Sequence, residues 1–167
     1  MTDSVDRILS QWAGVRPTLD VSAMGVVGRL SRLSRLLERE LNSVFEAHEL
    51  QPGEFDILAT LLRSDAGARG LTAGALADSA MVTSGAITNR LDRLVAKQLI
   101  SREVDPENRR TIRVALTARG SKVVEAALHD HVRNEESLLG VLSGTQRSEL
   151  ETLLRQLLTA HEAPVTR

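Results

Sequence analysis

Apolar residues recur every three or four positions along most of the chain, which is the pattern of amphipathic helices. The first such stretch, 5–13, ends before Pro17, whose ring would break a continuing helix. A longer stretch covers 24–47, and a third begins after Gln51-Pro52, where proline suits a first helical turn. The pattern therefore predicts an arm helix, a long helix and a shorter third helix in the first part of the chain.

Two short helices are expected after a glycine-containing loop at 64–70. Thr72 is a suitable N-cap for the first of them, which runs to about Asp78, and Thr83 or Ser84 is a suitable N-cap for the second. One face of the second helix carries the apolar residues Ile87, Leu91, Leu94 and Val95. A helix, a turn and a second helix follow one another here.

The pattern then changes to alternation, which is typical of strands. It predicts strands at 99–104 and 111–116, joined by the turn residues 105–108. Two more helices follow, one opened by Thr117 and one that begins within 143–145. The fold class is therefore mainly α with a small β-hairpin, and the order of elements is that of a winged helix-turn-helix with long terminal helices.

Composition agrees with a helical core, because 42% of residues are hydrophobic but only 2% are aromatic. The net charge of -1 is unusual for a nucleic-acid-binding protein, but the charge is sorted along the chain. Residues 82–120 carry eight Lys or Arg against four acidic residues, whereas 121–167 carry five against seven. The basic part coincides with the second short helix and the hairpin.

Several classes of protein are not expected. The chain has no cysteine, which excludes disulfides and thiol-based sensing. We find no HExxH motif, phosphate-binding loop or nucleophile elbow, and no run of about 18 apolar residues that could span a membrane. We therefore expect a cytoplasmic protein that is not an enzyme and that has no metal and no cofactor.

The second short helix is the candidate for entering the major groove of DNA. Its core face leaves Gly85, Ala86, Asn89 and Arg93 on the opposite side, with Thr88 and Arg90 on the flanks. Asparagine can pair with adenine, arginine with guanine or a phosphate, and arginines on a hairpin suit a narrow minor groove. The residues expected to contact DNA are Thr72, Thr83, Ser84, Gly85, Ala86, Thr88, Asn89, Arg90, Arg93, Arg109 and Arg110.

The segments 105–110 and 114–120 resemble the wing signature of the MarR family, and 88–94 resembles its recognition helix. The resemblance implies a homodimer on double-stranded DNA, in which two recognition helices and two wings span one operator. It divides the chain into an arm helix (1–20), dimerisation helices (21–50 and 117–167) and a winged helix-turn-helix (51–116). Asn108 stands where the family usually has Asp, so we expect a weaker Asp–Arg brace within the wing.

A narrower resemblance is to the urate-responsive branch of the PecS and HucR type, carried by Gln11-Trp12, 16–20, the run 53–56 and Arg90. It implies that a small aromatic anion such as urate or a purine lies between Trp12, Asp56 and Arg90. The physical alternative is that Trp12 anchors the arm, Asp56 pairs locally and Arg90 contacts only phosphate.

These patterns together predict a transcriptional repressor that binds a pseudo-palindromic operator as a homodimer and leaves it when the anion binds. The alternative is a dimeric helical adaptor that binds protein and has no sequence-specific affinity for DNA.

Overall fold

The computed structural model describes residues 2–51, 53–64, 69–79 and 84–162, and it is mainly helical with one small antiparallel sheet. This confirms the predicted fold class. In chain order the elements are α1 (Ser4–Val15), α2 (Ser22–Ala47), α3 (Glu54–Arg63), β1 (Leu71–Thr72), α4 (Ala73–Ser79), α5 (Ser84–Ala96), β2 (Ile100–Val104), β3 (Ile112–Leu116), α6 (Ala118–Leu138) and α7 (Gly144–Glu162).

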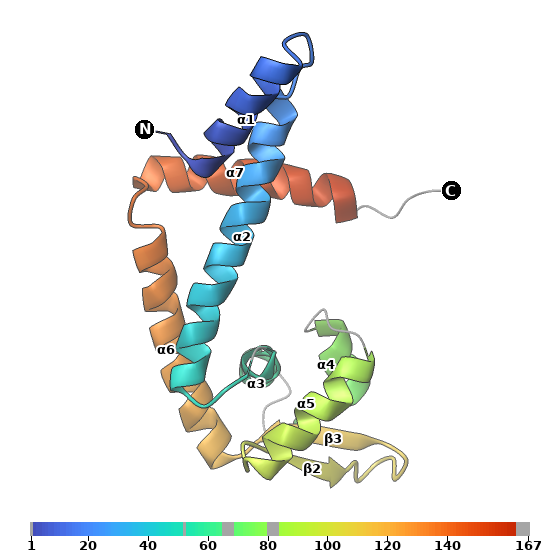
Figure 1. Ribbon diagram of the computed structural model, residues 1–167. Helices are drawn as coiled ribbons and strands as arrows, with labels where there is room; N and C mark the ends of the chain where they lie inside the picture. Colours follow the sequence, from blue (N-terminus) through green and yellow to red (C-terminus); the bar gives the residue numbers. More distant parts are fainter. Residues whose placement is uncertain (1, 52, 65–68, 80–83, 163–167) are drawn as a thin grey trace, which may run out of the picture.

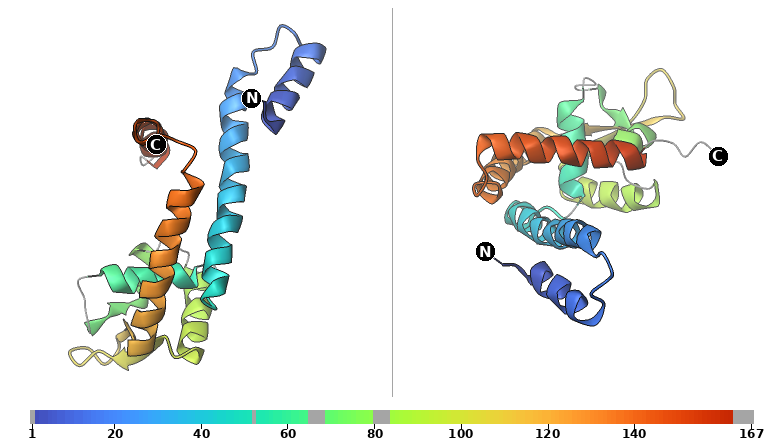
Figure 2. Two further views of the ribbon diagram at one scale, coloured as in Figure 1. Left: turned by 90° about the vertical axis from the view of Figure 1, so that its left-hand side faces the viewer. Right: turned by 90° about the horizontal axis from the view of Figure 1, so that it is seen from above.

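Two long helices, α2 and α6, run side by side and connect the two ends of the molecule (Figures 1 and 2). At one end α1 packs back on the first half of α2, and α7 turns away from α6 (Figure 1). At the other end lie α3, α4, α5 and the sheet, which together form the winged helix-turn-helix (Figure 1). None of the described helices is both long and apolar enough to cross a bilayer.

The hydrophobic core lies within the winged helix-turn-helix and the adjacent ends of α2 and α6. The rings of Phe45 in α2 and Phe55 in α3 stack with their centroids 4.4 Å apart. Burying such side chains contributes roughly 1.5–3 kcal/mol each, so this cluster holds the long helices to the wing region. Its other members include Leu50, Ile57, Leu58, Leu76, Ile87, Leu91, Leu94, Leu99, Val114 and Val124.

The sheet has three strands in the order β1-β3-β2, with Leu71 opposite Val114 and Ile100 opposite Leu116. The hairpin of β2 and β3 was predicted, but β1 was not, because two residues are too few to show an alternating pattern. Thr72 ends β1 and also caps the next helix, since its Oγ1 accepts a hydrogen bond from the amide of Ala75 at 3.1 Å. The predicted cap is therefore confirmed.

A second predicted cap is confirmed at the start of α6, where Thr117 Oγ1 accepts a hydrogen bond from the amide of Gly120 at 2.9 Å. The amide of Thr117 in turn donates to the carbonyl of Leu99 at 3.1 Å. This junction fixes the long helix to the start of β2. The predicted first-turn proline, Pro52, lies outside the described residues, and α3 begins at Glu54.

Candidate nucleic-acid interface

The helix α5 has most of the core face that its sequence predicts, but Val95, the fourth residue of the predicted face, is 38% exposed. Ile87, Leu91 and Leu94 are at most 3% exposed, and they seat the helix on the core. Asn89 on the opposite side and Thr88 on the flank are both exposed. The predicted contact residue Thr83, and the side chains of Ser84, Gly85 and Ala86 in the first turn of α5, lie outside the described part of the structure.

Arg93 is partly exposed, with 40% of its side-chain surface accessible, and it is paired with a residue of α3. Its Nε donates to Oε1 of Glu54 at 3.0 Å, and Glu54, the first residue of α3, has no exposed surface. Lys97, one turn further along, donates through Nζ to the other carboxylate oxygen at 2.7 Å. The Nε of Arg93 is thus bound to α3, and the expected contact of Arg93 with DNA stays a prediction.

Arg90 lies on the flank of α5 and is half-buried, with its guanidinium against Gly53. Gly53 has a φ of +77°, a conformation that favours glycine. A Cβ atom at this position would lie 2.4 Å from Cζ and Nη1 of Arg90. Glycine at position 53 therefore allows the turn before α3 and leaves room for the guanidinium of Arg90. From the sequence, Gly53 was indicated only by the resemblance of 53–56 to the PecS and HucR branch.

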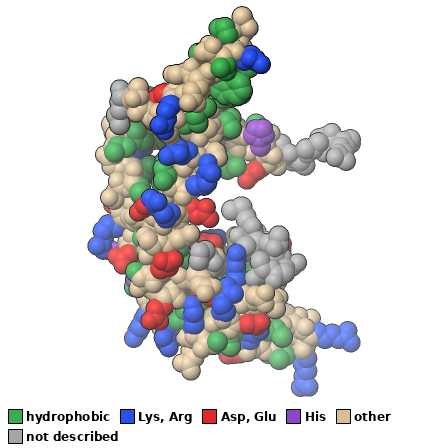
Figure 3. All heavy atoms as spheres, viewed as in Figure 1, with side chains coloured by type: hydrophobic (Ala, Val, Ile, Leu, Met, Phe, Trp, Pro, Cys, Tyr) green, Lys and Arg blue, Asp and Glu red, His purple; other side chains and the backbone are tan. Residues whose placement is uncertain are grey.

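The hairpin carries its two predicted arginines at its tip. Arg109 and Arg110 are exposed in the turn between β2 and β3, and Lys or Arg side chains project from this corner in Figure 3. Asn108 accepts a hydrogen bond from the backbone amide of Arg110 at 3.1 Å through Oδ1. Asn108 thus stabilises the turn itself.

The wing has an ion-pair brace, between Asp105 and Arg113, that the sequence did not predict. Asp105 is 3% exposed and pairs with Arg113 across the hairpin, while Nη1 of Arg113 donates to the carbonyl of Gly70 at 3.2 Å. The amide of Glu107 and the guanidinium of Arg113 hold the pKa of Asp105 below its usual value. The brace connects the wing to the segment just before β1.

Replacing Asp105 with Asn should loosen the wing without unfolding the core. The neutral amide keeps a hydrogen-bond acceptor but loses the charge that attracts Arg113. We expect amide hydrogen exchange within 103–112 to accelerate several-fold, while exchange in α2 and α6 stays unchanged. Glu103→Gln, an equal charge change on an exposed residue of β2, is the control. Equal protection of the hairpin in both variants would show that the brace does not hold the wing.

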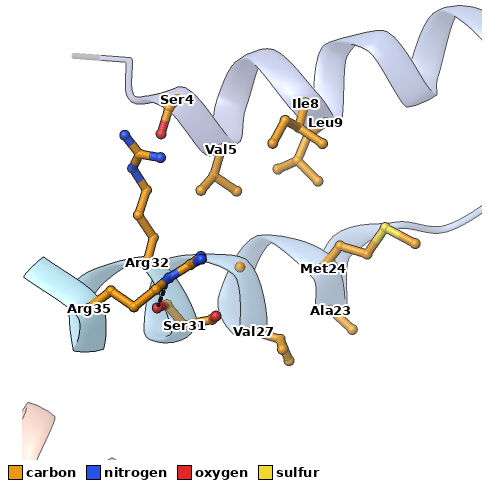
Figure 4. A pocket seen from close by; sticks show the side chains of 11 residues that line it. Ser4, Val5, Ile8, Leu9, Ala23, Met24, Val27, Ser31, Arg32 and Arg35 are labelled. Atoms are coloured by element: carbon orange, nitrogen blue, oxygen red, sulfur yellow. Dashed lines mark hydrogen bonds between the residues drawn. The ribbon is translucent and has the colours of Figure 1, made fainter.

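The three residues expected to hold a ligand do not come together within one chain. Asp56 and Gly53 line a hollow of about 740 Å³ between α2, α3, α6 and α7, and Arg90 lies against Gly53. Trp12 belongs to α1, which packs on the other end of α2 (Figure 1). There α1 and α2 enclose a separate apolar cleft whose lining includes Val5 and Met24 (Figure 4).

Comparison with known proteins now identifies the family. Residues 50–112 match the MarR family model. The chain is 36% identical over 150 residues to the HTH-type transcriptional regulator PecS of Dickeya dadantii, covering 90% of each chain. The chain belongs to the MarR family. Because the match to PecS covers nearly the whole of both chains, this chain belongs to the PecS branch of the family. It is a DNA-binding transcriptional regulator and not an enzyme.

Two solved structures of this family share the fold. The MepR–DNA complex of S. aureus is 26% identical, with a TM-score of 0.68, covering 78% of this chain and 96% of that one. A mutant MarR from E. coli in complex with operator DNA is also 26% identical, with a TM-score of 0.68, covering 88% and 97%. Both similarities cover more than three quarters of this MarR-family chain.

Proposed function

We propose that this MarR-family chain is a cytoplasmic repressor that binds a pseudo-palindromic operator as a homodimer. The observation that carries the proposal is the placement of α5 beside the hairpin at one end of the molecule (Figure 1). Thr88 and Asn89 are exposed on α5, and Arg109 and Arg110 are exposed at the hairpin tip. Such an arrangement suits one helix in a major groove and one wing over the adjacent minor groove.

Exposed apolar side chains on the long helices support the homodimer. Such side chains on α2 include Val26, Val27, Leu30, Leu33 and Leu36, and those on α7 are Leu153, Leu154, Leu157 and Leu158. The described part of α7 buries no residue within the chain. Apolar stripes of this length favour a partner surface, and a second copy would also supply the second recognition helix that a pseudo-palindrome requires.

The proposal is tested by titrating duplexes from the promoters next to the gene at two salt concentrations, with light scattering to measure the mass of the complex. We expect tight, sequence-dependent binding of one dimer, weakened by salt because phosphate contacts release counterions. A dimer that prefers no neighbouring promoter over an unrelated duplex would favour the adaptor alternative. A monomer on the operator would contradict the homodimer.

We further propose that a small aromatic anion, such as urate or a purine, occupies the hollow beside Asp56. The stacked rings of Phe45 and Phe55 lie at its wall, and Arg90 next to Gly53 supplies positive charge. His131 also lines it, and the buried Nδ1 of His131 has no hydrogen-bond partner among the described residues. A ligand that moves Arg90 would disturb α5 and shift the dimer away from the DNA-binding arrangement.

Trp12 can contact a ligand in this hollow only if it comes from a second copy of the chain. Mixed dimers test that arrangement: in a dimer of Trp12→Phe with Asp56→Asn subunits, one of the two sites would be intact. We expect urate or a purine to bind at about half the wild-type stoichiometry in the mixed dimer and much more weakly in either homodimeric variant. If the mixed dimer binds the ligand as weakly as the two homodimeric variants, the site is not shared between subunits.

A further inference from the structure

A buried carboxylate holds two cations of the recognition helix. Glu54 has no exposed surface, yet its side chain receives Arg93 Nε at 3.0 Å on one oxygen and Lys97 Nζ at 2.7 Å on the other. The amide of Gln51 donates to the same second oxygen at 2.8 Å, and Lys97 also donates to the carbonyl of Glu49 at 2.7 Å. Every oxygen of the buried carboxylate is therefore hydrogen-bonded.

The surroundings of Glu54 keep its charge. Burial by itself raises the pKa of the carboxyl, but the Gln51 amide and the side chains of Lys97 and Arg93 outweigh burial and bring the pKa below its usual value. The buried, ionised carboxylate attracts both cations, whose own side chains remain 40% (Arg93) and 32% (Lys97) exposed to solvent. The group is an ion cluster between Glu54 at the start of α3, Arg93 in the last turn of α5 and Lys97 just after α5.

The cluster changes which part of α5 is available to DNA. Arg93 and Lys97 lie four residues apart, on one side of the helix, and both point toward α3. On another flank, Asp92 pairs with Arg102 of β2 at 2.7 Å. The helix is thus fastened to α3 and to β2 by ion pairs, while the exposed Thr88 and Asn89 carry no charge.

We propose that Glu54 is a positioning residue for DNA recognition. Its ion pairs keep Arg93 and Lys97 from contacting the phosphate backbone, and they fix the position of α5 relative to α3. The inference rests on the proposed operator binding. Free cations at the end of a recognition helix would attract any duplex, because phosphate contacts carry no sequence information. Confining them lowers non-specific affinity and leaves discrimination to the uncharged side chains on the exposed face.

The test is Glu54→Gln in the full chain, which keeps the shape of the side chain and removes the charge that binds the two cations. The affinities for an operator and for an unrelated duplex are measured between 50 and 200 mM salt. A dimer would release four cations, and each new phosphate contact steepens the log–log salt dependence by about 0.9. We expect non-specific affinity to rise about tenfold or more and the operator preference to fall by a similar factor.

Glu49→Gln is the matched control, because it removes the same charge from an exposed neighbour whose carboxylate makes no ion pair among the described residues. Equal salt dependence and operator preference in the two variants would overturn the inference. A wild-type protein that prefers no promoter duplex would instead refute the proposed function, so the two failures are distinguishable.

A second variant keeps the test decisive if Glu54→Gln does not fold. Glu54→Gln combined with Arg93→Gln and Lys97→Gln removes all three charges and leaves hydrogen-bonding side chains of similar length. If the cations never contact DNA, the triple variant binds the operator with the wild-type salt dependence. A flatter salt dependence, or relaxed specificity at a single operator position, would show that Arg93 or Lys97 contacts DNA and would overturn the inference.

Discussion

Gly120→Ala is expected to destabilise the fold by about 3 kcal/mol or more. A Cβ atom at Gly120 would lie 1.9 Å from the carbonyl oxygen of Leu99 and 2.8 Å from its carbon. The same oxygen accepts the hydrogen bond from the amide of Thr117, so the backbone cannot move away without breaking that bond. Overpacking costs roughly 1–3 kcal/mol and a lost hydrogen bond about 1 kcal/mol more, against a typical total stability of about 5–15 kcal/mol.

Urea unfolding followed by circular dichroism measures this loss. The matched control is Gly14→Ala, because a Cβ atom at Gly14 in α1 would meet nothing within 4 Å apart from the neighbouring residues and backbone of its own helix. Alanine favours a helix over glycine by up to about 1 kcal/mol, so this variant should be as stable as the wild type or slightly more stable. Equal unfolding midpoints for the two variants would contradict the close approach of α6 to the start of β2.

Periodicity was sufficient to predict the elements that bury a continuous face. The core residues Ile87, Leu91 and Leu94 of α5 and the caps of α4 and α6 lie where the sequence placed them, because each depends on neighbours within a few residues. Local chemistry also predicted the hairpin and its exposed arginines. The strand β1 could not be predicted in this way, because it pairs with Val114 and Arg113, which are more than 40 residues away in the chain.

The orientation of charged side chains could not be predicted in the same way. On a helical wheel Arg93 faces away from the core, but α3 begins beside it and presents the buried Glu54. A carboxylate followed about 40 residues later by two cations four residues apart is a weak signal until tertiary structure brings them together. The separation of Trp12 from Asp56 likewise depends on how α1 folds back on α2, which no local pattern specifies.

Replacing Arg109 and Arg110 together with alanine is expected to weaken operator binding by about a thousandfold at 0.1 M salt. The two side chains are exposed at the hairpin tip, and a bound dimer would present four such guanidinium groups to the minor groove and its phosphates. Each lost phosphate contact reduces the log–log salt slope by about 0.9, which amounts to slightly less than tenfold in affinity at this salt concentration. The slope should therefore become less steep by about three to four.

The control for the wing variant is Arg7→Ala with Arg16→Ala, which removes the same charge from exposed positions in and just after α1, at the other end of the molecule (Figure 1). Fluorescence anisotropy of a labelled operator at several salt concentrations gives both affinity and slope. If net charge alone attracted DNA, the two double variants would lose affinity equally. A loss confined to the wing variant, with the preferred bases unchanged, would instead assign Arg109 and Arg110 to the phosphates and groove width, and leave base recognition to α5.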